Sequence, residues 1–281
     1  MKLGVKKIYI LYWILAILVF GGLFMTALGG DSKGKIPYQI VFFGDSVPGL
    51  VRDESGIPYQ VAEALGKTMM NSAFGGTCVG RVNTINELDY GKESLSLVAL
   101  TKAIANSDFG PQQSLRIRDP VSMEFESMVD ELEKVDFTQV ELVIIEHGVN
   151  DFYGGVPVRN DKNVMDEYTF GGALRTSIEA LRQVNPNMRI LLVTPTFTWL
   201  FQSGKACDEY NVGYGTLEAY IQEELKIAEE YGVEIIDIYH DFYPHETWDD
   251  WMVYSMDGLH PNEAGRTKIA NRISGYLKGE N

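Results

Sequence analysis

The sequence predicts an α/β domain of three layers (α/β/α), with a mainly parallel five-stranded sheet between two layers of helices. Short apolar segments of strand length, rich in β-branched residues, alternate along the chain with longer segments of helical periodicity. Strands and helices that alternate in this way form parallel sheets with helices on both faces. The length of 281 residues suffices for one such domain and a short appendage.

Four segments are predicted to be strands because each is mostly apolar on both faces, and a weaker pattern at residues 70–74 would complete a five-stranded sheet. The four segments are residues 39–43, 142–145, 189–194 and 234–238. Helices are predicted at residues 59–69, 94–105, 123–135, 170–184, 217–231 and 263–277. The last helix follows Pro261, and proline suits the start of a helix. Ligands of open parallel sheets bind beyond the carboxyl ends of the strands, so a site is expected in the segments that follow them.

The first thirty residues differ from the rest of the chain. Residues 8–28 form an apolar segment preceded by Lys2, Lys6 and Lys7. The segment is long enough to cross a bilayer as a helix, and the lysines place its amino terminus in the cytoplasm. We expect a basic cytoplasmic stretch at 1–7, a single-pass membrane anchor at 8–29, a tether at 30–37 and a folded domain at 38–281. A cleaved signal peptide is the alternative, and either form exports the domain.

The composition also indicates which partners to expect. The formal net charge of −15 repels nucleic-acid phosphates and anionic lipid headgroups. We therefore expect no nucleic acid, and contact with the membrane only through the N-terminal helix. Cys78 and Cys207 either form a disulfide or remain two buried thiols. His240 and His245 resemble metal ligands only loosely, so no metal is expected.

Residues suited to nucleophilic catalysis occur at both ends of the domain. Ser46 follows the first predicted strand, in FFGDSVPG. A serine hydroxyl is a weak nucleophile until a base removes its proton. His260 lies just before the last predicted helix, three residues after Asp257. An aspartate at this spacing can hold the imidazole through Nδ1–H and leave Nε2 free to face a serine.

Two further segments supply hydrogen-bond donors at predicted strand ends. Asn150 follows the third strand in GVND, and the backbone amide of Gly76 follows the second, with Gly75 as the alternative donor. Together with the N–H of Ser46, these groups can stabilise the oxyanion of an acyl-transfer intermediate.

GDS near the start, a glycine after the second strand, GxND after the third and DxxH near the end resemble the four sequence blocks of the SGNH (GDSL) hydrolase family. They occur in the family's order, and the resemblance covers residues 38–277. It implies a flavodoxin-like α/β/α fold and hydrolysis of carboxylic esters without a cofactor. It also implies a catalytic triad of Ser46, Asp257 and His260, and an oxyanion hole of Ser46, Gly76 and Asn150.

The polar neighbours of these residues have simpler expected roles. Asp45 is expected to cap a turn or helix beside the serine, and Asp151 to brace the turn of the asparagine. His147 is expected to be packed and hydrogen-bonded. Residues 47–49, Val-Pro-Gly, differ from those that often follow GDS in the family.

Aromatic residues gather in the loops expected at the active edge of the sheet, where they either pack the loops onto the domain or line a cleft. They are Phe152, Tyr153, Phe197, Trp199, Phe201, Phe242, Tyr243, Trp248 and Trp251. In an exported domain, a ring-lined cleft favours an O-acyl ester, acetyl foremost, on a glycan. The alternatives are a lipid esterase or lysophospholipase, a glycan O-acyltransferase, and a non-catalytic carbohydrate-binding domain of the same fold.

Overall fold

The computed structural model describes residues 34–82, 93–115, 125–200, 204–211 and 213–280. The chain divides into two units, Met1–Lys35 and Ile36–Asn281. The basic stretch expected at residues 1–7 and the membrane segment expected at 8–29 lie outside the described residues. Among the helices that are described, none combines the length and apolar character needed to cross a bilayer.

A five-stranded sheet with only parallel neighbours forms the centre of the second unit, in the order β2-β1-β3-β4-β7. The strands are β1 (Ile40–Gly44), β2 (Met69–Ala73), β3 (Leu142–Glu146), β4 (Arg189–Val193) and β7 (Glu234–Ile236). All residues of β1 and β3 are buried, which explains why their sequences are apolar except for Glu146 at the end of β3. Each predicted strand is confirmed, with ends that differ by one or two residues.

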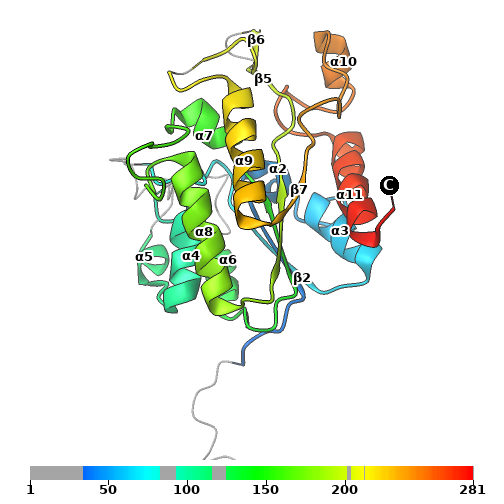
Figure 1. The fold of residues 1–281 in the computed structure, drawn as a ribbon. Coiled ribbons are helices and arrows are strands. Elements are labelled where there is room, and N and C mark those ends of the chain that lie inside the picture. Colours follow the sequence, from blue (N-terminus) through cyan, green and yellow to red (C-terminus); the bar gives the residue numbers. More distant parts are fainter. Residues whose placement is uncertain (1–33, 83–92, 116–124, 201–203, 212, 281) are drawn as a thin grey trace, which may run out of the picture. The chain divides into compact units, whose positions relative to one another are not determined.

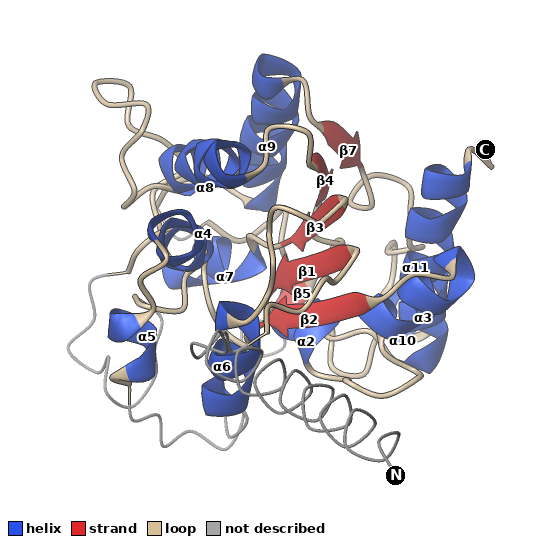
Figure 2. Ribbon diagram, turned by 90° about the horizontal axis from the view of Figure 1, so that it is seen from below, coloured by secondary structure: helices blue, strands red, loops and turns tan. Residues whose placement is uncertain are grey.

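Helices cover both faces of this sheet, as Figures 1 and 2 show. On one side α3 (Ile57–Leu65) packs against α11 (Glu263–Lys278). On the other side α8 (Phe170–Val184) packs against both α4 (Leu97–Asn106) and α9 (Leu217–Tyr231). A further helix, α6 (Phe125–Glu133), contacts β2. The predicted three-layer architecture is therefore confirmed.

The prediction was wrong about the end of the first long helix, which was expected to reach residue 69. Helix α3 ends at Leu65, because Gly66 adopts φ +63° and caps the helix in the left-handed conformation. Glycine reaches this conformation without steric cost and commonly ends helices. Met69, expected as the last helical residue, is instead the first residue of β2.

Short elements were not predicted, because two to six residues are too few to show a periodic pattern. They are the helices α2 (Ser46–Gly49), α5 (Gly110–Gln113), α7 (Val149–Gly154) and α10 (Trp248–Met252), and the hairpin of β5 (Trp199–Leu200) with β6 (Lys205–Ala206). Helix α2 follows β1 after one residue, and α7 follows β3 after two. Both lie at the carboxyl edge of the sheet.

The strand order places a crevice at a defined point of this edge. The chain passes from β1 to β2 on one side and then returns to β3 on the other side of β1. Connections that leave neighbouring strands in opposite directions open a crevice between them, where ligands of doubly wound sheets bind. The switch lies between β1 and β3, which the sequence blocks GDS and GxND follow.

The two cysteines do not form a disulfide. Cys78 and Cys207 are both buried thiols. The Sγ atom of Cys207 accepts a hydrogen bond from the backbone N–H of Thr198 at 3.3 Å. Of the two alternatives that the sequence left open, the pair of buried thiols is the correct one.

Candidate active site

Ser46 is the first residue of α2, at the carboxyl end of β1, which lies between β2 and β3. Asp45 caps this helix, as expected, because its Oδ1 accepts the N–H of Val47 at 2.9 Å. The cap fixes the sharp change from strand to helix and thereby the position of the serine. Ser46 is 7% exposed.

His260 and Asp257 complete a hydrogen-bonded series with this serine. Nε2 of His260 lies 2.9 Å from Oγ of Ser46, although 214 positions separate them in the sequence. Nδ1 of His260 lies 2.7 Å from Oδ2 of Asp257. The other carboxylate oxygen of Asp257 accepts the N–H groups of Leu259 and His260 at 2.9 and 2.8 Å. The imidazole is therefore held at Nδ1 and faces the hydroxyl through Nε2.

These hydrogen bonds also determine the charge of Asp257. Burial raises the pKa of Asp257, but the bonds from the His260 ring and from the backbone N–H groups of His260 and Leu259 outweigh burial. The net pKa of this carboxyl lies below its ordinary value. Asp257 is thus ionised at neutral pH and can stabilise a positively charged imidazolium at His260.

The loop that carries the pair is anchored at Gly258, between Asp257 and His260. The carbonyl oxygen of Gly258 accepts the indole N–H of Trp251 at 2.7 Å and the backbone N–H of Trp199 at 2.9 Å. Gly258 has φ +94°, and a Cβ atom there would lie 3.0 Å from the Trp199 carbonyl oxygen. A residue with a side chain would therefore be strained at this position and would crowd the backbone that anchors the loop.

The predicted oxyanion donors lie at the ends of the two strands beside β1. The register aligns Gly44 of β1 with Ala73 of β2 and with Glu146 of β3, so the three strands end level. After β2, residues 74–77 form a turn (the glycine turn), in which Gly76 has φ +73° and Thr77 N–H donates to the Phe74 carbonyl. Gly75 and Gly76 both belong to it.

Asn150 connects the segment after β3 with the glycine turn. It lies in α7, and its Nδ2 donates to the Thr77 carbonyl oxygen at 3.1 Å. A side-chain amide has two N–H donors, so this contact leaves one for another acceptor. The structure thus joins Asn150 to the turn that contains Gly75 and Gly76.

The model of the GDSL-like lipase/acylhydrolase family matches residues 42–268, which include every sequence block named above. The chain belongs to this family. Its membership supports a carboxylic ester hydrolase. No curated protein matches the chain.

Solved structures of low sequence identity share the fold. A possible lipase from Chitinophaga pinensis has a TM-score of 0.57 at 17% identity, over 87% of this chain and all (100%) of that one. A carbohydrate acetylesterase from Sinorhizobium meliloti has a TM-score of 0.52 at 14% identity, over 85% and 98% of the two chains. The salicylyl-acyltransferase SsfX3 of a tetracycline biosynthetic pathway has a TM-score of 0.53 at 14% identity, over 89% and 56%.

Asp151, the residue after Asn150, is a buried acid of the hydrolase. Both oxygens of the Asp151 carboxyl accept backbone N–H groups, from Val79 at 2.8 Å and from Gly80 at 2.9 Å. Asp151 therefore braces the segment after the glycine turn, rather than the turn of Asn150 for which the sequence suggested it. Burial raises the pKa of Asp151 to about 7.

Packing explains several of the aromatic residues in the loops of the hydrolase. Phe152, Phe197, Tyr243 and Trp251 are buried. The partly buried residues are Tyr153, Trp199, Phe242 and Trp248, while Phe201 lies outside the described residues. Phe197 stacks on the imidazole of His245 at 3.9 Å between ring centroids. For the four buried rings, the packing alternative is the correct one.

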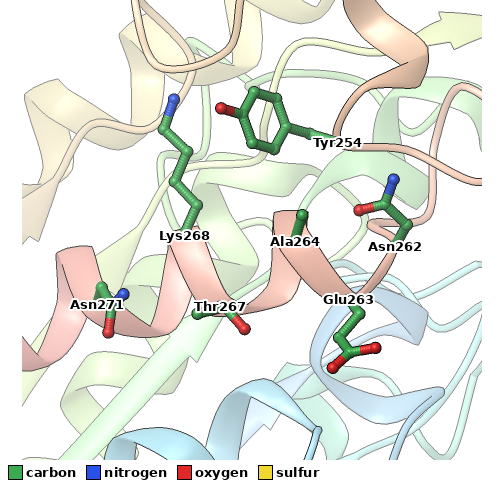
Figure 3. Close-up of a pocket in the computed structure, with 7 residues that line it drawn as sticks. All are labelled: Tyr254, Asn262, Glu263, Ala264, Thr267, Lys268 and Asn271. Carbon is green, nitrogen blue, oxygen red and sulfur yellow. The ribbon is translucent and has the colours of Figure 1, made fainter.

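A hollow of about 750 Å³ lies beside the loop of residues 257–260 (the catalytic loop) but does not include Ser46, His260 or Asp257. It is lined by Tyr254, Asn262, Glu263, Ala264, Thr267, Lys268 and Asn271 (Figure 3). The Lys268 ammonium lies 4.7 Å from the ring centroid of Tyr254 and donates to the Phe242 carbonyl. Burial lowers the pKa of Lys268. This lysine ties the loops to α11.

In the described part of the chain, no group of three histidine, cysteine, aspartate or glutamate residues is placed to hold a metal ion. The chemistry that the site can perform with its own groups is the transfer of a proton from the Ser46 hydroxyl to His260 and attack by the serine oxygen. The sequence identified these residues. It did not reveal the contacts that anchor Gly258, because Trp199 and Trp251 carry no motif of their own.

Proposed function

We propose that the chain is an exported serine esterase that removes O-acyl groups, acetyl foremost, from a glycan, with Ser46 as its nucleophile. The observation that carries the proposal is the hydrogen-bonded series from Asp257 through His260 to Ser46, with distances of 2.7 and 2.9 Å. A carboxylate, an imidazole and a hydroxyl in this order are the groups that activate a serine for acyl transfer.

In the first step, neutral His260 accepts the proton of the Ser46 hydroxyl while Oγ attacks the ester carbonyl. The negative charge that develops on the carbonyl oxygen is stabilised by the N–H groups of Ser46 and Gly76 and by the free amide N–H of Asn150. Asp257 stabilises the imidazolium that forms. His260 then gives the proton to the departing alcohol oxygen, and the acyl group remains on Ser46.

In the second step, water takes the place of the alcohol. His260 removes a proton from the water molecule, whose oxygen attacks the acyl carbon, and the same donors stabilise the second oxyanion. Collapse of this intermediate releases the acid and returns the proton to Ser46. The cycle uses only groups of the protein, so no cofactor enters it.

The glycan substrate is supported by three observations of different kinds. A carbohydrate acetylesterase shares the fold. The N-terminal sequence is typical of an exported and tethered protein. Partly exposed aromatic rings at Trp199 and Trp248, 5.9 Å apart between centroids and in contact with the loop of Gly258, are suited to pack against sugar rings.

The nucleophile is tested by labelling the purified chain with a fluorophosphonate probe. We expect labelling of the wild type and none of Ser46→Ala; equal labelling of both would refute the serine mechanism. Substrate class is tested with acetylated sugars and with p-nitrophenyl esters of increasing chain length. Activity confined to long acyl chains would favour a lipid esterase, and transfer of the acyl group to an added sugar would favour an acyltransferase.

The place of the domain is tested in intact cells. We expect the folded domain to be accessible to protease from outside, with the N-terminal segment still attached. A cytoplasmic domain would contradict the export that the sequence predicts, and a soluble secreted form would show that the segment is cleaved.

A further inference from the structure

A buried acid and a buried imidazole occur next to Ser46 and after the neighbouring strand, and neither has a role in the steps above. Asp45 precedes Ser46 and is fully buried, and His147 follows the neighbouring strand β3 and is 3% exposed. Oδ2 of Asp45 and Nδ1 of His147 are 3.8 Å apart. Neither atom has a hydrogen-bond partner among the described residues. Unpaired buried polar atoms are costly, so a pair of them beside the reaction centre calls for an explanation.

The hydrogen bonds of Thr77 determine which nitrogen of His147 carries the proton. Oγ1 of Thr77 donates its only proton to the Phe74 carbonyl oxygen at 2.7 Å. The contact of 3.4 Å between Oγ1 and Nε2 of His147 must then be donated by the ring. A neutral imidazole with its proton on Nε2 presents a lone pair at Nδ1, and this lone pair faces Asp45.

The same contacts locate one further proton. If Asp45 were ionised, two acceptors would face each other in a buried place, which is unfavourable unless one of them is protonated. Burial raises the pKa of Asp45 to about 6, although the Val47 N–H and His260 oppose the change. Burial lowers the pKa of His147 to about 3, so below the pKa of Asp45 the proton of the pair belongs to the carboxyl rather than to the ring.

We propose that protonated Asp45 and neutral His147 are positioning residues that join the start of α2, where Ser46 lies, to the glycine turn through one series of hydrogen bonds. In this series (the buried relay) Asp45 Oδ2–H donates to His147 Nδ1, His147 Nε2–H to Thr77 Oγ1, and Thr77 Oγ1–H to the Phe74 carbonyl. A small approach of the Asp45 and His147 side chains completes its first bond. The proposal rests on the proposed role of Ser46.

The buried relay connects the parts of the site that must keep a fixed separation. At one end, the other oxygen of Asp45 caps α2 and so holds Ser46. At the other end, Thr77 belongs to the turn of Gly76, and its carbonyl oxygen binds the Asn150 amide. Oxyanion donors stabilise a transition state only when they are held at hydrogen-bond distance from the developing charge. The relay therefore fixes the donors relative to the nucleophile.

Ionisation of Asp45 would reverse the relay. The imidazole would have to move its proton to Nδ1 in order to donate to the carboxylate. Nε2 would then need a donor, and Thr77 would have to turn its hydroxyl away from the Phe74 carbonyl. The other titratable groups that act on Asp45 are His260, Glu146 and Asp151. Burial raises the pKa of Glu146 and that of Asp151. We expect kcat to fall as pH rises through the ionisation of Asp45.

Two substitutions of Asp45 separate the relay from the cap. In Asp45→Asn, the amide oxygen still caps α2 and the amide N–H donates to His147 at every pH. In Asp45→Ser, the hydroxyl can cap α2 but does not reach His147. We expect Asp45→Asn to keep kcat within about 3-fold of wild type, and Asp45→Ser to lose about 10-fold with little change in KM, which corresponds to one buried hydrogen bond. The alkaline fall of kcat should be absent from Asp45→Asn.

A double-mutant cycle provides the second test. His147→Phe keeps an aromatic ring at this position but removes both nitrogens. It should lower kcat as much as Asp45→Ser does. The double variant should lose no more than either single one, because both break the same series. Additive losses would overturn the proposal. So would an Asp45→Asn variant as impaired as Asp45→Ser, since that result would show that the carboxylate charge is what matters.

Labelling of the wild type with the fluorophosphonate probe keeps the two proposals distinct. If the wild type is not labelled, the role of Ser46 fails. If the wild type is labelled but the Asp45 variants contradict the expected pattern, only the buried relay fails. Thermal unfolding shows whether each variant folds, and the pH profile of Asp45→Asn decides alone if Asp45→Ser does not fold: an unchanged alkaline fall would overturn the relay.

Discussion

The chain contains two DxxH segments that are nearly identical in their local structure and differ in what they reach. In Asp237–His240, as in Asp257–His260, the ring Nδ1 lies 2.7 Å from the aspartate Oδ2, and Oδ1 accepts two backbone N–H groups. His260 meets the hydroxyl of Ser46 at 2.9 Å, whereas His240 meets the carboxylate of Glu218 at 3.0 Å. The pair Asp257–His260 faces a nucleophile, and the pair Asp237–His240 forms part of an ion pair.

The surroundings of the two pairs explain the difference. Gly258, inside Asp257–His260, is anchored by Trp199 and Trp251, and the His260 side chain is 24% exposed. The His240 side chain is 43% exposed and lies beside Glu218 of α9. The spacing DxxH therefore produces an oriented imidazole wherever it occurs. Whether that imidazole is a base in catalysis depends on the group that the fold brings to its Nε2.

The largest loss of kcat is expected when the Ser46 hydroxyl is removed, because this group distinguishes the two pairs. Ser46→Ala should lower kcat by about 10⁴-fold or more, because the serine, the histidine and the acid act as one unit. Glu218→Ala removes the corresponding partner of His240 and should change kcat less than about 2-fold. Ester hydrolysis by the purified variants measures both. Substantial activity in Ser46→Ala would mean that the comparison assigns the wrong pair.

A smaller effect is expected from the two aspartates. Asp257→Asn should lower kcat about 10²-fold or more, because the amide no longer holds the imidazole in its required tautomer or stabilises its charge. The matched variant Asp237→Asn should remain within about 2-fold of wild type. Steady-state kinetics at the pH optimum compares them. If both variants lost the same activity, the two segments would not differ in function.

The anchor of the catalytic loop gives the third prediction. Trp251→Phe keeps a buried ring but removes the N–H donor to Gly258, and kcat should fall about 10-fold as the loop loses one buried hydrogen bond. Tyr220→Phe is the matched control, because it removes a buried donor to the Val156 carbonyl, away from the loop. An equal loss of activity in the control would show a general effect of destabilisation instead.

The smallest expected effect is on the free energy of unfolding, at the pair Asp237–His240. The hydrogen bond to Asp237 raises the pKa of His240, so the charged imidazole favours the folded state. This contribution is complete below the unfolded pKa of 6.5 and disappears as pH rises through the raised folded pKa. His240→Gln should therefore cost less than about 1 kcal/mol at pH about 5, because the pair is exposed, and almost nothing at pH about 9. Urea unfolding at both pH values measures it; a pH-independent difference would contradict this account.

The elements that the sequence predicted well are those whose pattern extends over a whole strand or several helical turns. Residues 40–43 of β1 and 142–145 of β3 are all apolar because both faces of the sheet are covered, and α8 and α9 have the predicted bounds. The short helices α2, α7 and α10 were missed although α2 begins at Ser46 itself. Their formation depends on caps such as Asp45 and on packing against the sheet edge rather than on periodicity.

The candidate site was predictable to the extent that it consists of short local motifs. GDS, GxND and DxxH identified Ser46, Asn150, Asp257 and His260. The segment Asp237–His240 was not recognised as a counterpart of Asp257–His260, and His240 was considered only as a weak metal ligand. His147 and Asp45 were taken as a packed histidine and a cap, and their facing unpaired atoms could not be foreseen because they come from different strands.

The sequence by itself determined the chemical groups and every arrangement that spans about three residues, since such hydrogen bonds form between neighbours along the chain. It therefore specified the aspartate that orients His260 and the cap in front of Ser46. Only the tertiary structure decided that His260 rather than His240 faces the serine, and that Asp45 meets His147. These contacts join segments as many as 214 positions apart, and they form only because parallel strands of fixed register bring their carboxyl ends together.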